Sequence, residues 1–147
     1  PKGLSRERCN VAFMLRGGGV PAGRSDELVQ NTDILPTILK LTGTDTNAHF
    51  EGRVPEVLGG PAARKRVFTE ILYPGTPYEA TVKDKGFDFY FKTEANVDEE
   101  GNVDLSRNQV SLFLKDDFRV DVSADHRDVM EDFKRVVAEH RAGRAPV

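Results

Sequence analysis

The sequence is poor in the features that would assign it quickly to a class of protein. Its 147 residues include a single cysteine, Cys9, and no tryptophan. One cysteine excludes an internal disulfide and any CxxC metal or redox pair. No apolar run approaches the roughly 18 residues that a membrane-spanning helix needs, and the first residues do not resemble a signal peptide. We therefore expect no membrane partner for this chain.

The chain also lacks a strong excess of charge of either sign. It carries 21 Lys and Arg against 24 Asp and Glu, so its net charge is −3. Nucleic-acid-binding proteins present basic patches to phosphates, and this mild acidity argues against a nucleic-acid partner. Hydrophobic residues make up 38% of the chain, which together with the length is typical of a globular domain of ordinary size.

The composition changes near residue 60. Residues 1–60 carry equal numbers of basic and acidic side chains, whereas residues 61–147 supply the whole acidic excess. The stretch 59–66 between them has the Gly, Pro and charge content of an exposed connector. We therefore expect two parts, residues 1–60 and residues 61–147.

Two elements are predicted in the first part. Val11–Leu15 is an unbroken apolar run, which is typical of a strand buried on both faces of a parallel sheet. Asp33–Gly43 has the spacing of a short helix. With Asp33 as the N-cap, Pro36 falls in the first turn, where its missing N–H costs nothing, and Gly43 suits a left-handed C-terminal stop.

The second part alternates polar and apolar residues with period two. Strands are predicted over residues 67–72, 87–91, 110–114 and 118–122, with a solvated hairpin loop at Asp98–Asn102. After Asp125, the expected N-cap, the apolar stripe that includes Val129, Phe133 and Val137 predicts a C-terminal helix. The sequence thus predicts an α+β fold, an antiparallel sheet of about four strands with a C-terminal helix, preceded by a strand-loop-helix segment.

Residues that could carry chemistry lack neighbours to complete a site. Gly17–Gly19 is not followed by the Lys-Ser/Thr of a P-loop, which favours a simple turn. The pairs Asp125-His126 and Glu139-His140 have no second ligand cluster, which favours helix capping for the first and a frayed helix end for the second. Cys9 has no adjacent histidine or basic helix end, which favours an inert thiol, and His49 lies in a polar loop without partners. No GxSxG or HExxH motif is present.

Five segments share a pattern with one enzyme family at compatible spacings. They are Lys2-Gly3 with Glu7 and Val11 to Gly23; Val29 with Thr32-Asp33-Ile34-Leu35-Pro36-Thr37-Ile38-Leu39 and Gly43; Glu51-Gly52-Arg53-Val54; Arg66 to Glu70; and Ser111 to Leu114. Their order resembles the C-terminal third of a sulfatase, in the alkaline-phosphatase-like superfamily. The second segment is the most specific match. The chain departs from the pattern at Arg6, where an aromatic residue is common, at Ala12, where Pro is usual, and at Phe118, near the usual D-P turn.

The resemblance implies that residues 1–60 end a large α/β sulfatase domain and that residues 61–147 form its small C-terminal subdomain. The parent reaction would be sulfate-ester hydrolysis, with a formylglycine nucleophile and a calcium ion held elsewhere in the protein. The family's nucleophile motif, Cys or Ser followed by x-Pro-x-Arg, is absent, since Asn10 and Val11 follow Cys9. The reaction needs both the nucleophile and the cation, so we expect this chain alone to be inactive.

Lys2 is the one position to which the resemblance carries a site role. It implies that the Lys2 ammonium contacts the sulfate, where a compact point charge suits an oxyanion; the alternative is a terminal lysine that binds nothing. The implied partner is the rest of the same catalytic domain, and unpaired edges would let Val11–Leu15 self-associate. Two other functions stay open: a non-catalytic interaction or lid module, and a parent enzyme that hydrolyses phosphonates or phosphodiesters.

Overall fold

A computed structural model describes residues 3–4, 9–10, 12–17, 19–115 and 117–143. The chain divides into two compact units, and each is treated by itself below. One unit spans residues 12–67. The other comprises residues 68–143 together with the described residues among 3–4 and 9–10.

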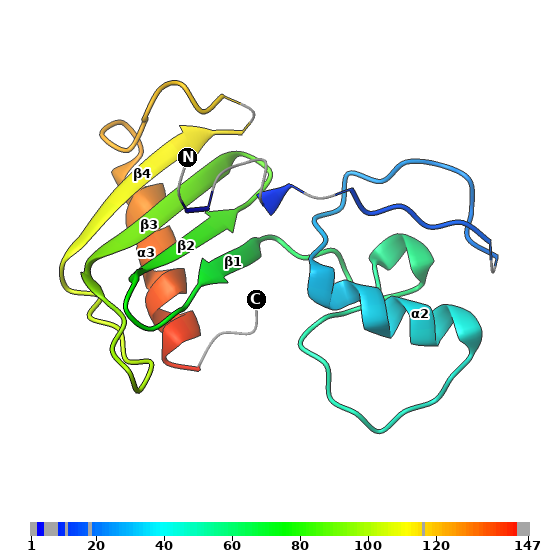
Figure 1. The fold of residues 1–147 in the computed structure, drawn as a ribbon. Coiled ribbons are helices and arrows are strands. Elements are labelled where there is room, and N and C mark those ends of the chain that lie inside the picture. The colour runs from blue at the N-terminus through cyan, green and yellow to red at the C-terminus, as the bar shows by residue number, and fades with distance from the viewer. Residues whose placement is uncertain (1–2, 5–8, 11, 18, 116, 144–147) are drawn as a thin grey trace. The chain divides into compact units, whose positions relative to one another are not determined.

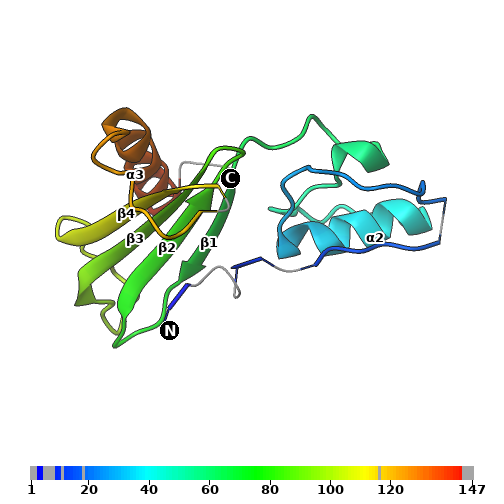
Figure 2. The same cartoon turned by 90° about the horizontal axis from the view of Figure 1, so that it is seen from above.

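The unit of residues 68–143 is built on a four-stranded antiparallel sheet in which the strands lie in chain order (Figure 1). The strands are β1 (Val67–Ile71), β2 (Pro77–Lys83), β3 (Phe87–Asn96) and β4 (Asn108–Leu114). Helix α3 (Arg127–Arg141) packs against β2 and β3. Figure 2 shows the helix along one face of the sheet only. The α+β class predicted from the sequence is confirmed.

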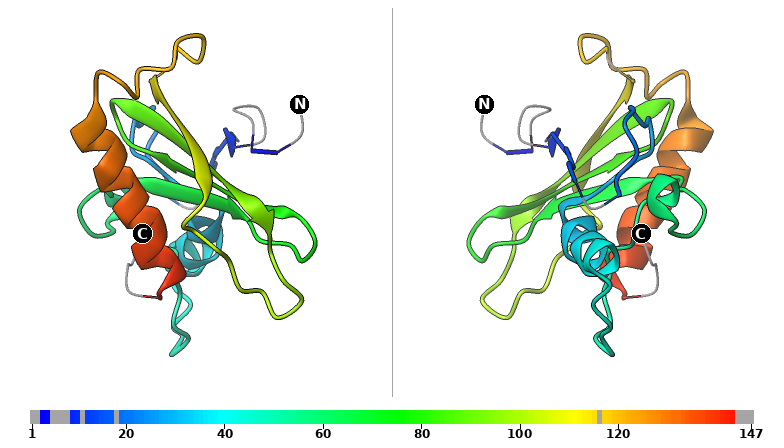
Figure 3. Two further views of the ribbon diagram at one scale, coloured as in Figure 1. Left: turned by 90° about the vertical axis from the view of Figure 1, so that its left-hand side faces the viewer. Right: turned by 90° about the vertical axis from the view of Figure 1, so that its right-hand side faces the viewer.

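The core of this unit lies between α3 and the sheet. Phe89 of β3 is opposite Val82 on one side and Leu112 on the other, and its ring centroid lies 5.6 Å from that of Phe133 on α3. Figure 3 shows how α3 crosses the strands that supply these side chains. The fully buried side chains include Tyr78, Val82, Phe89, Leu112, Phe133 and Val137. Each large apolar side chain buried in this way contributes roughly 1.5–3 kcal/mol.

The predicted number of strands is correct, but one strand was misplaced. β2 was missed although Tyr78, Ala80 and Val82 alternate with Glu79, Thr81 and Lys83 in the period-two pattern of a strand. It departs from that pattern only in that Glu79 and Thr81 are buried as well. The strand predicted at 118–122 does not form. Instead, the Val122 N–H donates to the Leu112 carbonyl and the Asp121 carboxylate accepts from the Leu112 N–H, so this segment covers the edge of β4 without a ladder of its own.

The start of α3 also differs from the prediction. The helix begins at Arg127 with His126, not Asp125, at the N-cap, and His126 makes no side-chain capping bond. The His126 ring lies 5.0 Å from the Phe87 ring in an edge-to-face arrangement, so the imidazole packs against the sheet. The hairpin loop predicted at 98–102 does form, and the Asp98 carboxylate closes it by accepting the Asn102 N–H at 2.7 Å.

The described residues of the unit 12–67 contain one α-helix, α2 (Ile34–Thr42), preceded by the 3-10 turn η1 (Asn31–Asp33) and followed by η2 (Glu56–Leu58). α2 ends at Gly43, whose φ of 66° is left-handed, as the sequence predicts. The strand predicted at Val11–Leu15 is wrong for its described residues: 12–15 form no strand, and Met14 is 86% exposed. An apolar run forms a buried strand only beside partner strands, and the described residues of this unit form none; Val11 lies outside the described residues.

Candidate functional site

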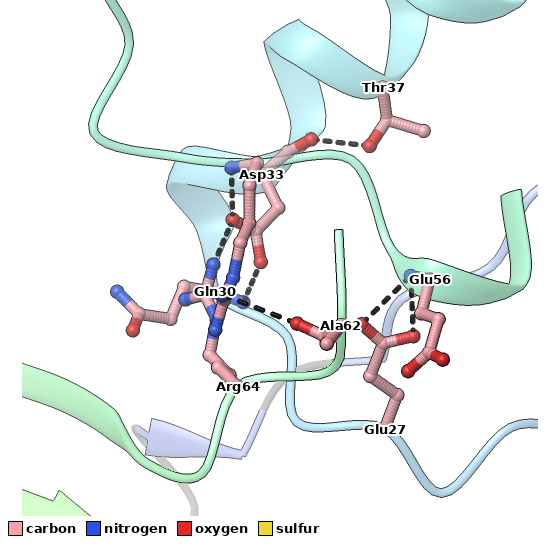
Figure 4. A network of polar contacts seen from close by, with 8 residues as sticks. Glu27, Gln30, Asp33, Thr37, Glu56, Ala62 and Arg64 are labelled. Carbon is pink, nitrogen blue, oxygen red and sulfur yellow. Dashed lines mark hydrogen bonds and ion pairs between the residues drawn. The ribbon is translucent and has the colours of Figure 1, made fainter. Parts of the chain in front are cut away.

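The carboxylate of Asp33 is the centre of the unit of residues 12–67 (Figure 4). Its Oδ1 accepts from the Arg53 N–H at 2.9 Å and from Nη2 of Arg64 at 2.5 Å. Its Oδ2 accepts from the Gln30 N–H at 2.7 Å. Asp33 sits at the N-cap of α2 as predicted, but its side chain makes no capping bond to that helix. It joins three segments of the chain instead.

Local sequence explains how these segments come together. The Thr37 hydroxyl donates to the Asp33 carbonyl at 2.6 Å, which fixes the first turn of α2. Gly52 lets the backbone before Arg53 pass against η1, since a Cβ at Gly52 would lie 1.9 Å from the Thr32 carbonyl oxygen. Any other residue at 52 would push Arg53 away from the carboxylate.

The Asp33–Arg64 ion pair is buried. The side chains are 2% and 3% exposed, respectively. Removing two charges from water is costly, and close pairing with additional hydrogen bonds offsets that cost. Because the carboxylate already holds three donors, it serves as a structural anchor and is poorly suited to act as a base or metal ligand.

Two glutamates extend this network toward the connector. Glu27 accepts the Glu56 N–H at 2.9 Å through Oε2, and Glu56 in turn accepts the Ala63 N–H at 2.8 Å. The prediction of an exposed connector over 59–66 is therefore wrong at Arg64, which is 5% exposed. Arg64 is buried because its guanidinium reaches Asp33, 31 positions earlier in the chain.

The first turns of helix α2 expose apolar side chains and bury polar ones, whereas later in the helix Leu39 and Leu41 are half-buried and Lys40 and Thr42 are exposed. Asp33 and Thr37 are 1% and 0% exposed. Ile34, Leu35 and Ile38 are 43%, 52% and 46% exposed. A helix of a globular protein normally does the reverse. Clustered exposed apolar side chains of this kind mark surfaces that bind another protein segment.

A second group of polar residues lies on the face of the sheet opposite α3. Glu79 is 6% exposed, receives the Leu4 N–H at 2.9 Å and lies 3.2 Å from Nζ of Lys92. Burial, and then the charge and hydrogen bond of Glu79, raise the pKa of Tyr90 well above its usual value. Tyr90 is therefore a neutral hydrogen-bond donor here over the ordinary pH range.

The neighbouring residues on that face pair their charges in the same way. Nζ of Lys83 lies 3.5 Å from Asp88 and 2.9 Å from Oδ1 of Asn10. Together with the Glu79–Lys92 pair, the face carries two cations and two carboxylates. It is balanced in charge and does not by itself form an anion-binding site.

Within each unit, the other residues singled out from the sequence have separate surroundings. Sγ of Cys9 lies 4.0 Å from the Thr81 hydroxyl, and His49 is exposed. Nε2 of His140 lies 3.5 Å from Glu70, a partner that sequence spacing did not reveal. Lys2, the sulfate contact implied by the resemblance, lies outside the described residues.

Within the described residues, no group of three or more His, Cys, Asp or Glu side chains is arranged to hold a metal ion. No helix in that part of the chain combines the length and apolar character needed to cross a membrane. Comparison with known proteins finds no family model that matches the chain and no significant match among the curated proteins.

Proposed function

We propose that this chain is the supporting C-terminal part of a sulfatase-like hydrolase whose reaction is sulfate-ester hydrolysis. The observation that carries the proposal is the exposed apolar face at the start of α2. The helix lies in the segment that most specifically resembles the family, and its apolar side chains Ile34, Leu35 and Ile38 are exposed although Asp33 and Thr37 are buried. A supporting segment of a larger α/β domain needs such an outward apolar face.

The exposed side of α2 has enough apolar surface to matter energetically. Complete burial of an aliphatic side chain contributes roughly 1.5–3 kcal/mol, and three side chains on α2 are about half exposed. In this proposal the large α/β domain of the same hydrolase covers them. The Asp33 anchor then holds α2 in place from the opposite side, through Arg53 and Arg64.

The reactive groups of the parent enzyme belong to its other part in this proposal. The donor atoms of a calcium site are not gathered among the described residues, and Cys9 is not followed by x-Pro-x-Arg, so neither the cation nor a formylglycine fits here. The calcium ion would neutralise charge on the sulfuryl oxygens. This chain contributes rigidity and, through Lys2, a candidate sulfate contact.

The first test is the coding sequence upstream of Pro1 together with an activity assay. The proposal expects that sequence to encode Cys or Ser followed by x-Pro-x-Arg, with paired aspartates. It also expects residues 1–147 alone to give no turnover of an aryl sulfate with calcium present. Turnover that Cys9→Ala or Lys2→Ala abolishes would contradict the proposal, as would an upstream sequence without a hydrolase domain, which would favour the interaction or lid module.

A second test asks whether α2 docks on the parent domain. Ile38→Glu in the full-length protein is expected to lower the free energy of unfolding by about 2 kcal/mol, since it places a charge in an apolar interface. In residues 1–147 alone the same change has little effect, because Ile38 is 46% exposed there. Lys40→Glu is the matched control, because Lys40 is exposed but lies two positions from Ile38 and therefore away from the face of Ile34, Leu35 and Ile38. Equal effects of Ile38→Glu in both proteins would refute docking.

Assays on phosphonate and phosphodiester substrates then separate the remaining alternatives for the parent reaction.

A further inference from the structure

The face of the sheet opposite α3 carries polar side chains that face one another across β2 and β3. In register order the facing residues are Glu79 and Lys92, Thr81 and Tyr90, and Lys83 and Asp88. Three of them, Glu79, Thr81 and Asp88, are only 6%, 6% and 9% exposed. Polar side chains on the outer face of an antiparallel sheet are normally left to water, so another part of the chain covers them here.

That cover includes the start of the chain. Its described residues contact β2 at three successive positions of this face, at 2.9, 4.0 and 2.9 Å: Leu4 with Glu79, Cys9 with Thr81, and Asn10 with Lys83. They precede their partners by 75, 72 and 73 positions. The start of the chain and the sheet nevertheless belong to one compact unit, although residues 12–67 form another unit between them in the sequence.

The contact at Glu79 is made by a carboxylate that several groups hold in place. Its Oε2 accepts the Leu4 N–H at 2.9 Å, and its Oε1 lies 3.2 Å from Nζ of Lys92. The Tyr90 hydroxyl donates to the same carboxylate. We call Glu79, Lys92 and Tyr90 the Glu79 site. If the Leu4 N–H left this site, a buried carboxylate oxygen would lose a donor, which is unfavourable.

The Glu79 site also depends on a glycine directly before the donor amide. Gly3 has a φ of 102°, which L-residues with a side chain rarely adopt. A Cβ at Gly3 would lie 2.1 Å from Oε2 and 2.8 Å from Cδ of Glu79. The carboxylate cannot move aside without losing its contacts to Lys92 and Tyr90. The backbone at this point therefore approaches Glu79 only because residue 3 has no side chain.

We propose that this face of the sheet is a docking site for the start of the same chain, and that the Glu79 site controls whether the whole segment is docked. The docked residues among those described are Gly3, Leu4, Cys9 and Asn10. They bind the sheet and leave it together, because the chain joins them and a single hydrogen bond contributes little by itself. Loss of the contact at Glu79 therefore exposes Cys9 as well.

The test uses Cys9, the only cysteine of the chain, which is half-buried. Its rate of alkylation by iodoacetamide is measured at fixed pH in residues 1–147. Gly3→Ala changes no residue of the sheet and is expected to raise the rate about ten-fold, because the strained φ and the collision with Glu79 both oppose docking. Gly17→Ala is the matched control, since Gly17 has a φ of 93° but nothing within 4 Å of a Cβ. An unchanged rate in Gly3→Ala overturns the proposal.

Glu79→Gln tests the other side of the same contact. It keeps the size of the side chain but removes the charge that strengthens the hydrogen bond from Leu4, so a rise of about five-fold is expected. Glu94→Gln, at a carboxylate of β3 that is 44% exposed and paired with Arg107, should leave the rate unchanged. The double variant Gly3→Ala with Glu79→Gln is expected to react no faster than Gly3→Ala, because both changes remove one contact. Effects that multiply would show that Gly3 does not act through Glu79, and would overturn the proposal.

Two further measurements distinguish docking from other causes of faster alkylation. Amide hydrogen exchange of β3 is expected to be the same in Gly3→Ala as in the unmodified chain; a loss of protection that matches the gain in alkylation would mean general unfolding and would overturn the proposal. The alkylation rate is also expected to be independent of protein concentration. A rate that falls as the concentration rises would mean that a second copy supplies the docked segment, which equally contradicts the proposal.

Discussion

The two units of this chain are stabilised by opposite means. The unit of residues 68–143 buries rings and aliphatic side chains between α3 and the sheet, with Phe89, Leu112 and Phe133 essentially inaccessible to water. In the unit of residues 12–67, the buried residues among those described are Asp33, Thr37, Pro55 and Arg64. One unit has an apolar core, and the other has a buried ion pair with apolar residues on its surface.

The difference suggests different requirements for folding. An apolar core is non-directional and stabilises whatever buries it, so the sheet unit has what a free-standing domain needs. A buried ion pair contributes little net stability but strongly disfavours arrangements that leave one charge unpaired. In the unit of residues 12–67, polar contacts define the arrangement of the chain, while Ile34, Leu35 and Ile38 stay available for another surface.

The largest effect is expected from removing an apolar side chain from the core of the sheet unit. Phe133→Ala is expected to lower the free energy of unfolding of the sheet unit by about 4 kcal/mol, because it leaves a cavity against Phe89. Urea unfolding followed by circular dichroism measures the change. Met14→Ala, at a residue 86% exposed, should stay within about 0.5 kcal/mol. Similar losses from both variants would show that burial does not distinguish these sites.

The next largest effect is expected from removing one partner of the buried Asp33–Arg64 ion pair. Asp33→Ala leaves Arg64 buried without its partner, and we expect a loss of about 3 kcal/mol, seen as faster amide exchange throughout residues 12–67. Asp45→Ala, at an exposed site, is the control. The double variant Asp33→Leu with Arg64→Met should recover part of the loss, because neither charge is then stranded. If the double variant is as unstable as the sum of its single changes, the anchor acts in some other way.

A smaller effect is expected from changing Gly52, which lets the backbone before Arg53 approach Thr32. Gly52→Ala is expected to cost about 2 kcal/mol, since the new methyl group would collide with the backbone of Thr32 and displace Arg53. Gly23→Ala is the matched control, because nothing lies within 4 Å of a Cβ there. Equal stability of the two variants would mean that the approach of residue 52 to η1 is not required.

The smallest effect concerns alkaline pH. The pKa of Tyr78 is raised by burial and by Glu70, so its contribution to stability is complete below the unfolded value near 10 and declines as pH rises above it. Tyr78→Phe loses about 1 kcal/mol at neutral pH with the hydrogen bond, and its stability should fall less steeply above pH 10. Thermal unfolding between pH 8 and 11 compares the slopes. A steeper fall for Tyr78→Phe would contradict this linkage.

Local patterns were sufficient to predict most of the secondary structure. The period-two alternation around Phe87–Phe91 and Val110–Leu114 located β3 and β4, and Gly43 marked the end of α2. β2 has the same alternation and was nevertheless missed; what its local pattern does not reveal is that Glu79 and Thr81 are buried. The resemblance of residues 66–70 and 111–114 to a known family added no further strand or helix boundary to this prediction.

The candidate site was much less predictable than the fold. Asp33 was recognised as a residue at the start of a helix, but its partner Arg64 lies 31 positions away, and helix periodicity carries no information about such a contact. The Glu70–His140 pair is separated by 70 positions and was equally inaccessible. The self-association predicted for Val11–Leu15 stays a prediction, although no strand forms in the described residues 12–15.

The segment of Asp121 and Val122, which lies beside β4, affects the tendency of the protein to aggregate at high concentration. Partial burial, the largest single influence, raises the pKa of the Asp121 carboxyl, but hydrogen bonds from Ser123, Ser111 and the Leu112 N–H together lower it below its usual value. The ionised Asp121 carboxylate thus lies at the edge strand β4, and a strand from another molecule would have to displace it to pair with β4. A charged group at an edge strand opposes the edge-to-edge pairing of strands that leads to aggregation.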